Sequence, residues 1–477
     1  MKATIAILVL LALLGAAFLL SNRRLPLVRN GLVYASASRH VVEHGYDPRP
    51  VVADSKLSYD KPILYAWMSA LLVARIGAHD GLRVTSWLGT VAFLLATAYF
   101  ARAFLGRDSP ALLWLAAFGP CVVYQFWSAH PDGWFAALVV LAWALAEKIV
   151  ADPATRSVRR IALLGAVVYA SILLKNYGLI LLISIPLYAL VRRARLPKRA
   201  WIASVLVFGA IGALVLLAWT GHHPLSRLEG EGGGVGQYNQ GVFWTSAKGT
   251  WVQLGIAILL QFHVALLLAA RRSAWVRETV VPLLCFGGVY VAGLMPFPTT
   301  FYNMRYFVPL FPLVALVLLR GAEAFGKVPR LALLAAHTAI AGVLVLVFDW
   351  APAYRAAEPA IPSLTVNWIG TPLSLLDNLR MRLHLEQAAV LENIELEVPS
   401  GAVLYMMDVG YYGDAQHGVY ERDGLIRADI TTRYVSSRDF HPGETAFYVY
   451  GSRGRPRVLD GFGKVTDLGG SLFRVES

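Results

Sequence analysis

The sequence predicts an all-α polytopic membrane domain with about eleven transmembrane helices, followed by a small C-terminal soluble domain of α/β or β-rich type. The chain has 477 residues, of which 57% are hydrophobic and only 15% are charged. A soluble domain usually carries about 25% charged residues, so this chain has too few to cover a water-exposed surface. Long apolar runs recur up to position 350, whereas the tail from 395 has short apolar stretches separated by turn formers.

Each predicted span is an apolar run that approaches the length needed to cross a bilayer, about 20 residues. The first of them follows Lys2 and resembles a signal peptide, but it lacks a small-residue cleavage site, so we interpret it as a retained helix. The predicted spans are 3–20, 83–104, 109–127, 132–149, 160–174, 177–191, 201–220, 252–270, 279–296, 302–320 and 331–348.

The basic residues predict how these spans are oriented. The net charge is +13, and most Lys and Arg side chains lie in short clusters between apolar runs. Such clusters are typical of loops that face the cytoplasm, so the charge argues against a nucleic-acid partner. The clusters lie near 102–107, 148–160, 192–199, 271–277 and 320–330.

A twelfth apolar stretch, 62–78, is shorter and is interrupted by Arg75. If it crossed the membrane, every later basic loop would face the wrong side. We therefore predict that it lies along the outer membrane interface as an amphipathic helix. A full span here, giving twelve in all, is the alternative that breaks the positive-inside pattern.

The predicted domains follow from this topology. Residues 1–350 form the transmembrane domain, whose first outer loop, 21–82, contains interfacial helices. Residues 351–394 form a linker with a further interfacial helix near 373–392, and residues 395–477 form the soluble domain on the outer side. Within that domain, 402–408, 446–450 and 472–475 have the composition of short strands.

Polar residues at the outer ends of the predicted helices are the candidates for a functional site. They are Lys61, His130, Asp132, Lys175, Arg305 and Tyr306. Alternatives remain open, because Asp132 suits a helix N-cap and Lys175 suits interfacial snorkelling. Several cations beside one carboxylate favour an anionic ligand at the outer interface, for which a lipid phosphate is the natural candidate.

Five motifs resemble those of GT-C membrane glycosyltransferases, closest to the protein mannosyltransferase and aminoarabinose transferase group. Segment 61–67 is similar to the family's Lys-Pro-Pro-Leu-x-x-Trp element, and 81–86 to its Gly-x-x-x-Arg-x-x-Ser element. Segment 129–132 matches its second acidic position, 174–178 its Thr-Lys-x-x-Gly turn, and 305–312 its Arg-Tyr-x-x-Pro-x-x-Pro element. The resemblance covers roughly residues 1–350, and these motifs occur in the family's order.

The resemblance implies an inverting glycosyltransferase of the bacterial inner membrane. Its donor would be a polyprenyl-phosphate sugar, and its acceptor a lipid, glycan or protein on the periplasmic face. Lys61, Lys175 and Arg305 would bind the phosphate, with Tyr306 and His130 lining the substrate site. Asp132 would act in catalysis by orienting donor or acceptor. No zinc-type cysteine spacing is present, no residue is assigned as a metal ligand, and dependence on a divalent metal stays open.

One departure from the family concerns the catalytic base. The family carries Asp-Glu in the first loop, where this chain has Asn30 and Gly31. An amide cannot accept the acceptor's proton, so a substitute carboxylate, a different chemistry, or a loss of catalysis is implied. The substitute carboxylates are Glu43, Asp54 and Asp60.

Two other functions remain open at this point. A catalytically inactive polyprenyl-phosphate-binding protein would explain the missing acidic pair at Asn30 and Gly31. A transporter is the third hypothesis, but the sequence shows no matching halves with broken helices.

Overall fold

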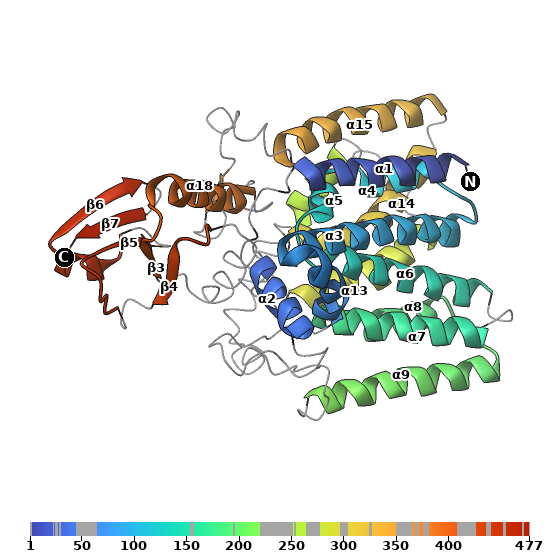
Figure 1. Cartoon of the computed structure of the whole chain (residues 1–477). Helices are drawn as coiled ribbons and strands as arrows, with labels where there is room; N and C mark the ends of the chain where they lie inside the picture. The colour runs from blue at the N-terminus through green and yellow to red at the C-terminus, as the bar shows by residue number, and fades with distance from the viewer. Residues whose placement is uncertain are drawn as a thin grey trace. The chain divides into compact units, whose positions relative to one another are not determined.

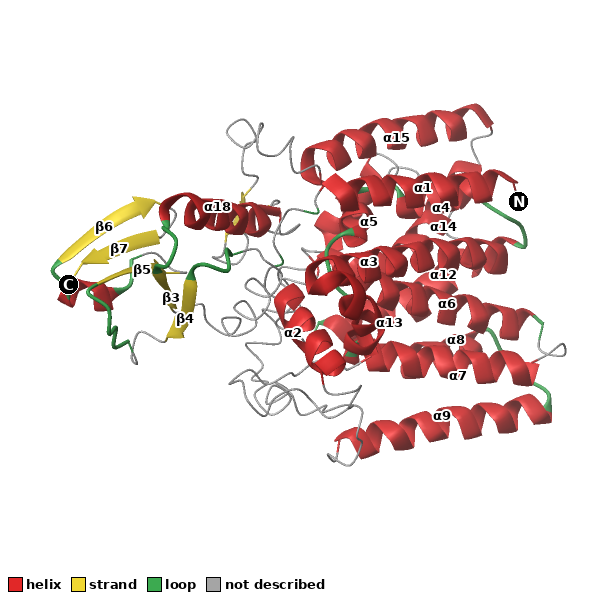
Figure 2. Cartoon of the chain, in the orientation of Figure 1, coloured by secondary structure: helices red, strands yellow, loops and turns green. Residues whose placement is uncertain are grey.

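The computed structural model describes most of the predicted helices and strands (Figures 1 and 2). The described residues are 2–21, 23, 27, 30–43, 64–152, 157–193, 196–219, 251, 254–263, 277–295, 304–323, 327–349, 365–367, 372–374, 381–407, 426–435, 440–451, 455–469 and 472–476.

The chain divides into two units. The first comprises Met1–Asn22, Asp60–Tyr65 and Arg83–Leu379, and the second comprises Arg23–Tyr59, Ala66–Leu82 and Arg380–Ser477.

Helices make up nearly all of the first unit as described (Figure 2). Among them, α6 packs against both α7 and α8, α7 packs against α9, and α14 packs against α4 and α15. Their bounds are α1 Lys2–Ser21, α4 Pro110–Ala117, α5 Pro120–Val123, η1 Tyr124–Phe126, α6 Asp132–Ala151, α7 Ser157–Leu174, η2 Asn176–Ile180, α8 Leu181–Val191, α9 Lys198–Trp219, α12 Arg277–Pro282, η6 Leu283–Gly288, α13 Val289–Leu294, η8 Met304–Leu310, α14 Phe311–Glu323 and α15 Lys327–Asp349.

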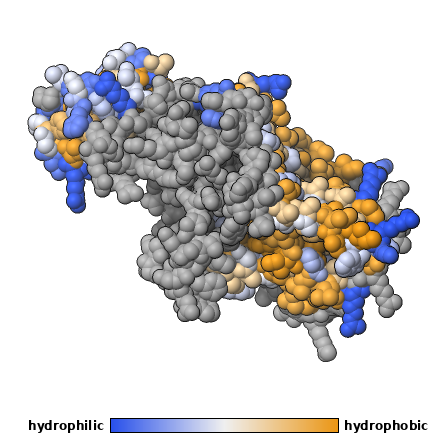
Figure 3. All heavy atoms as spheres, turned by 90° about the horizontal axis from the view of Figure 1, so that it is seen from below, coloured by the Kyte–Doolittle hydropathy of each residue, from blue (hydrophilic) through white to orange (hydrophobic). Residues whose placement is uncertain are grey.

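Five helices among the described residues are long and apolar enough to cross a membrane, and three shorter apolar helices accompany them. In α9 only 11% of the apolar window is buried, which suits a helix that faces lipid. Figure 3 shows hydrophobic residues gathered over the helices on the face in view. The polytopic membrane class is thereby confirmed, while the count of eleven spans stays a prediction.

The stretch 62–78 and the span 83–104 form one element, α3 (Leu64–Leu105). Gly77 interrupts it with φ 80° and ψ 166°, a left-handed conformation that favours glycine. The predicted separation of the two stretches therefore has a physical counterpart at Gly77. Whether the part before Gly77 lies along the interface stays a prediction.

A break between α4 and α5 is stabilised by neutral polar side chains. Phe118 and Gly119 are extended there, which frees carbonyl groups at the end of α4. Gln261 donates from Nε2 to the carbonyl oxygens of Leu115 and Ala116 at 3.1 and 3.3 Å. His337 in α15 donates from Nε2 to the Phe118 carbonyl at 3.0 Å. We call Gln261 and His337 the neutral cluster; both are fully buried and satisfy backbone groups that water cannot reach.

The second unit contains α2 (Asn30–Glu43), the first part of α3, and the tail. The tail begins with α18 (Met381–Glu397), later than the helix predicted over 373–392. It continues with a five-stranded sheet of order β4-β3-β5-β7-β6 (Figure 1). The strands are β3 Val403–Met407, β4 Thr431–Val435, β5 Ala446–Gly451, β6 Lys464–Gly469 and β7 Leu472–Glu476.

In this sheet β3 is parallel to β4 and β5, whereas β7 is antiparallel to β5 and β6. Alternating side chains from β3, β5 and β7, including Tyr405, Phe447 and Phe473, form a buried core with Phe440. The predicted small C-terminal domain with a sheet is thereby confirmed. The short pair β1 (Thr365–Asn367) and β2 (Pro372–Ser374) belongs to the first unit.

Candidate functional site

Asp132 is the first residue of α6, and close packing of that helix against α3 determines where its carboxylate lies. A Cβ atom added to Gly133 would lie 2.7 Å from Thr90 Oγ1 and 2.8 Å from the Thr90 nitrogen, so only glycine permits this approach. The N-cap of α6 is Pro131, so Asp132 is not the cap. Only 2% of its side chain is exposed.

The chain before Asp132 is held by two side chains of the Gly-x-x-x-Arg-x-x-Ser motif. Arg83 is buried and donates to the Trp127 carbonyl at 3.1 Å, and Ser86 donates to the Gln125 carbonyl at 2.7 Å. Ala129 has φ 59°, a left-handed conformation that is costly for a residue with a Cβ. These contacts hold a strained turn directly before Asp132.

Lys175 lies in a tight turn between α7 and η2. Its backbone is extended, its N–H donates to the Ser171 carbonyl at 2.9 Å, and its carbonyl accepts from the Gly178 N–H at 2.8 Å. A Cβ at Gly178 would lie 2.5 Å from the backbone nitrogen of Ile172. The glycine therefore permits the fold-back that presents Lys175 to the bundle interior.

Arg305 and Tyr306 lie in η8, near its start. The carbonyl of Tyr306 accepts a hydrogen bond from the buried Tyr290 hydroxyl of α13 at 2.8 Å. Tyr177 packs edge-on against Tyr306 with ring centroids 5.3 Å apart. Two elements distant in sequence thereby hold the segment that carries Arg305.

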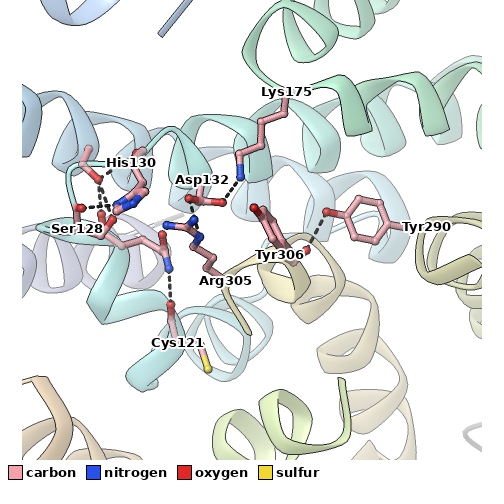
Figure 4. Close-up of polar contacts among 10 residues, drawn as sticks. Cys121, Ser128, His130, Asp132, Lys175, Tyr290, Arg305 and Tyr306 are labelled. Carbon is pink, nitrogen blue, oxygen red and sulfur yellow. Dashed lines mark hydrogen bonds and ion pairs between the residues drawn. The ribbon is translucent and has the colours of Figure 1, made fainter. Parts of the chain in front are cut away.

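These elements bring Asp132, Lys175 and Arg305 together, and we call the three side chains the charged cluster (Figure 4). The Lys175 ammonium donates to Asp132 Oδ1, and Arg305 Nε lies 3.3 Å from Asp132 Oδ2. Tyr306 presents its ring to both cations, 4.2 Å from Lys175 Nζ and 5.5 Å from Arg305 Cζ. Exposed fractions of 9%, 2% and 4% for the Lys175, Asp132 and Arg305 side chains show that the charges are almost wholly buried.

The other predicted site residues differ in their placement. His130 is buried two residues from Asp132, and its Nδ1 hydrogen-bonds the Ser128 carbonyl (Figure 4). Glu43 ends α2, is exposed, and belongs to the second unit. Lys61, Asp54 and Asp60 lie outside the described residues, as does the side chain of Asn30.

Buried ions are costly to a membrane protein, so the charged cluster calls for a reason beyond stability. Two cations share one carboxylate and rest on one aromatic ring, an arrangement suited to an anion with several acceptor oxygens. Among the described residues, no three His, Cys, Asp or Glu side chains are placed to hold a metal ion.

Sequence reasoning missed Tyr290 and Tyr177 as supports of this site. Tyr290 lies in an apolar segment with no local signal, and only the hydrogen bond from its hydroxyl to the Tyr306 carbonyl reveals its role. Tyr177 lay within the recognised 174–178 turn, where its aromatic type was the available signal.

Solved structures with this architecture are known. The chain is 15% identical to ArnT from Cupriavidus metallidurans bound to undecaprenyl phosphate, over 99% of this chain and 97% of that one, with a TM-score of 0.55. Against apo ArnT from the same organism the identity is 14%, the coverage is the same, and the TM-score is 0.52. No protein-family model and no curated protein sequence matches the chain.

This similarity over the whole length shows the fold. The chain has the GT-C fold, as the five motifs predicted, and its structural neighbours include the aminoarabinose transferase ArnT.

Proposed function

We propose that the protein is a glycosyltransferase that moves a sugar from a polyprenyl-phosphate donor to a lipid, glycan or protein acceptor. The proposal places the reaction on the periplasmic face of a bacterial inner membrane, with the C-terminal domain on the same side. The observation that carries it is the buried charged cluster on a GT-C fold. A neighbour of that fold, ArnT, is seen bound to undecaprenyl phosphate, a ligand of the proposed class.

Lys175 and Arg305 would bind the phosphate of the donor. In the transfer, the bond between the sugar's anomeric carbon and the phosphate oxygen breaks, and its electron pair stays on that oxygen. The acceptor hydroxyl attacks the anomeric carbon from the opposite face, which inverts its configuration, and loses its proton to a base. Cations already fixed beside the leaving phosphate stabilise the charge that develops on it without reorganisation.

The residue that takes the acceptor's proton is not assigned by this proposal. Each oxygen of Asp132 faces a cation. This arrangement suits a carboxylate that orients neighbouring groups better than it suits a general base. Glu43, Asp54 and Asp60 remain the proposed substitutes for the acidic pair replaced by Asn30 and Gly31. Exchanging each to its amide in the full chain would identify the base as the change that abolishes transfer while donor binding persists.

The proposal is tested with the full chain in lipid nanodiscs and a polyprenyl-phosphate sugar labelled in the sugar. We expect label to move to an envelope lipid, glycan or protein fraction, and to move far more slowly with Arg305→Ala. Arg199→Ala, a change to an exposed arginine at the start of α9, is the matched control and should behave as wild type. Absence of both transfer and polyprenyl-phosphate binding contradicts the proposal.

A second candidate is a polyprenyl-phosphate-binding protein without transferase activity. The replacement of the acidic pair by Asn30 and Gly31 favours it. Tight binding of polyprenyl phosphate that Arg305→Ala abolishes, with no turnover of any labelled donor, would distinguish this candidate from the first.

A further inference from the structure

The charged cluster has a feature that an anion-binding site does not require: it already contains its own anion. Each oxygen of Asp132 faces a different cation, with Lys175 Nζ on Oδ1 and Arg305 Nε 3.3 Å from Oδ2. Guanidinium and ammonium groups bind carboxylates and phosphates through the same donors. A lipid phosphate that reaches Lys175 and Arg305 must therefore share or take over the contacts that Asp132 now makes.

The burial of the three side chains makes this competition strong. With exposed fractions of 9%, 2% and 4%, their charges interact with little screening by water. Two anions at the same pair of cations also repel each other, and that repulsion grows with the charge on the incoming phosphate. A donor phosphodiester carries one negative charge, whereas the phosphomonoester left after transfer carries about 1.5 to 2 at neutral pH.

We propose that Asp132 is an internal counter-anion that competes with the lipid phosphate for Lys175 and Arg305. This inference rests on the proposed function, because it assumes that the site's ligand is a lipid phosphate. In the empty site Asp132 offsets one of the two positive charges of Lys175 and Arg305. In the occupied site it weakens phosphate binding, and it weakens binding of the monoester product more than binding of the diester donor. Asp132 thereby determines which phosphate class the site retains, and it promotes product release.

The cations have supports that do not depend on Asp132. The Tyr306 ring lies 4.2 Å from Lys175 Nζ, and the Tyr290 hydroxyl holds the Tyr306 carbonyl at 2.8 Å. The turn at Gly178 fixes Lys175 from its own backbone. In a variant without the Asp132 charge, Lys175 and Arg305 therefore stay positioned to bind an incoming phosphate.

The test is the affinity of the full chain, in nanodiscs of uncharged phosphatidylcholine, for polyprenyl phosphate. We expect Asp132→Asn to bind it about tenfold more tightly than wild type, and to release it correspondingly more slowly. Asp108→Asn is the matched control, because Asp108 also pairs with an arginine, Arg102, but that arginine is exposed on α3. It should leave the affinity unchanged.

A second pair of variants covers the case in which Asp132→Asn does not fold. Lys175→Gln removes one cation, and the double variant Asp132→Asn with Lys175→Gln has the same net charge as wild type. We expect the double variant to bind polyprenyl phosphate about tenfold more tightly than Lys175→Gln alone. Equal or weaker binding after the loss of the Asp132 charge, in either background, overturns the inference.

The result also separates this inference from the proposed function. Binding by wild type with equal affinity in Asp132→Asn overturns the counter-anion role alone. No binding by wild type, Asp132→Asn or the double variant overturns the proposed function, and the inference with it.

Discussion

Of the buried polar clusters among the described residues of the helical unit, two differ clearly in charge. The neutral cluster, Gln261 and His337, donates three hydrogen bonds to carbonyl groups at the break between α4 and α5. The charged cluster joins Asp132, Lys175 and Arg305 through side-chain atoms alone. One cluster satisfies the backbone, whereas the other links ionised side chains to one another.

The difference indicates what each cluster is for. Freed carbonyl groups in a bilayer must find donors, and neutral amides and imidazoles provide them at the lowest desolvation cost. The ion pairs between the charged side chains meet no such backbone requirement, and buried ion pairs can often be replaced by apolar residues of similar size without loss of stability. We therefore expect the neutral cluster to contribute stability and the charged cluster to contribute binding and catalysis.

The largest expected effect comes from removing a cation of the charged cluster. Lys175→Gln should lower transfer by about 100-fold or more, because the developing charge on the leaving phosphate loses a fixed cation. The measurement is the initial rate with labelled donor in nanodiscs, for protein of verified fold. Lys198→Gln, an exposed lysine at the start of α9, should behave as wild type. Undiminished transfer by Lys175→Gln would break the distinction between the clusters.

A change in the neutral cluster should have the opposite signature. Gln261→Leu leaves the Leu115 and Ala116 carbonyls without this donor, so we expect a loss of about 2 kcal/mol of stability. The rate per folded molecule should change little. Denaturation in mild detergent measures the first quantity, and the nanodisc assay measures the second. Leu331→Ala, on a 63% exposed side chain of α15, is the control for surface changes.

A double-mutant cycle sharpens this result. A Cβ at Gly119 would lie 2.3 Å from Gln261 Oε1, so Gly119→Ala must displace the amide from both carbonyl groups. The second change of the cycle is Gln261→Ala. The loss of stability caused by Gly119→Ala should be smaller in the Gln261→Ala background, since the two changes remove the same hydrogen bonds. Additive costs would show that Gly119→Ala acts by another route.

The sequence predicts the charged cluster better than the neutral one, and the reason is physical. Asp132, Lys175 and Arg305 each stand at the end of an apolar run, so topology alone places them on one side of the membrane. Gln261 and His337 are single polar residues within apolar runs, and their partners lie more than 140 positions away. Only the packing of the helices brings them to the α4–α5 break.

The same contrast holds in the C-terminal sheet. The composition of β3, β5 and β7, whose residues are mostly apolar, predicts these strands, and the structure shows most of those residues buried. The sequence reading missed β4 and β6, which lie at the two edges of the sheet. Every position of β6 is exposed or half-buried, so the strand carries little of the apolar pattern on which such a prediction depends.

A smaller effect is expected from a residue that supports the charged cluster without joining it. Tyr290→Phe keeps the ring and removes the hydroxyl that holds the Tyr306 carbonyl. We expect the KM for donor to rise about fivefold, which is the value of one neutral hydrogen bond, with kcat changed less. Tyr169→Phe, a change to a half-buried tyrosine of α7, is the control. If Tyr290→Phe lowered the stability and left KM and kcat unchanged, the role of Tyr290 would be structural.

The smallest effect is expected for a surface ion pair of the tail, between Arg433 and Glu444. In the tail, the Tyr405 hydroxyl donates to Glu444 at 2.5 Å and Arg433 lies 2.6 Å from it. The hydrogen bond from Tyr405, and then the Arg433 charge, hold the pKa of the Glu444 carboxyl below its usual 4.5. Because the folded-state pKa is lowered, the stabilisation is complete above pH 4.5 and is lost as pH falls through the folded value.

Hydrogen exchange of the β3 and β5 amides in the full chain, corrected for intrinsic rates, measures this effect. Between pH 5 and pH 3, Glu444→Gln should lessen the loss of protection by about 0.5 kcal/mol or less, since water screens the exposed Arg433. Glu395→Gln, on an exposed carboxylate of α18, is the control. The free-energy change from Glu444→Gln could instead be as large as the rise in activation free energy that Lys175→Gln causes in transfer. Burial would then not be what distinguishes the charged cluster from an ordinary surface ion pair.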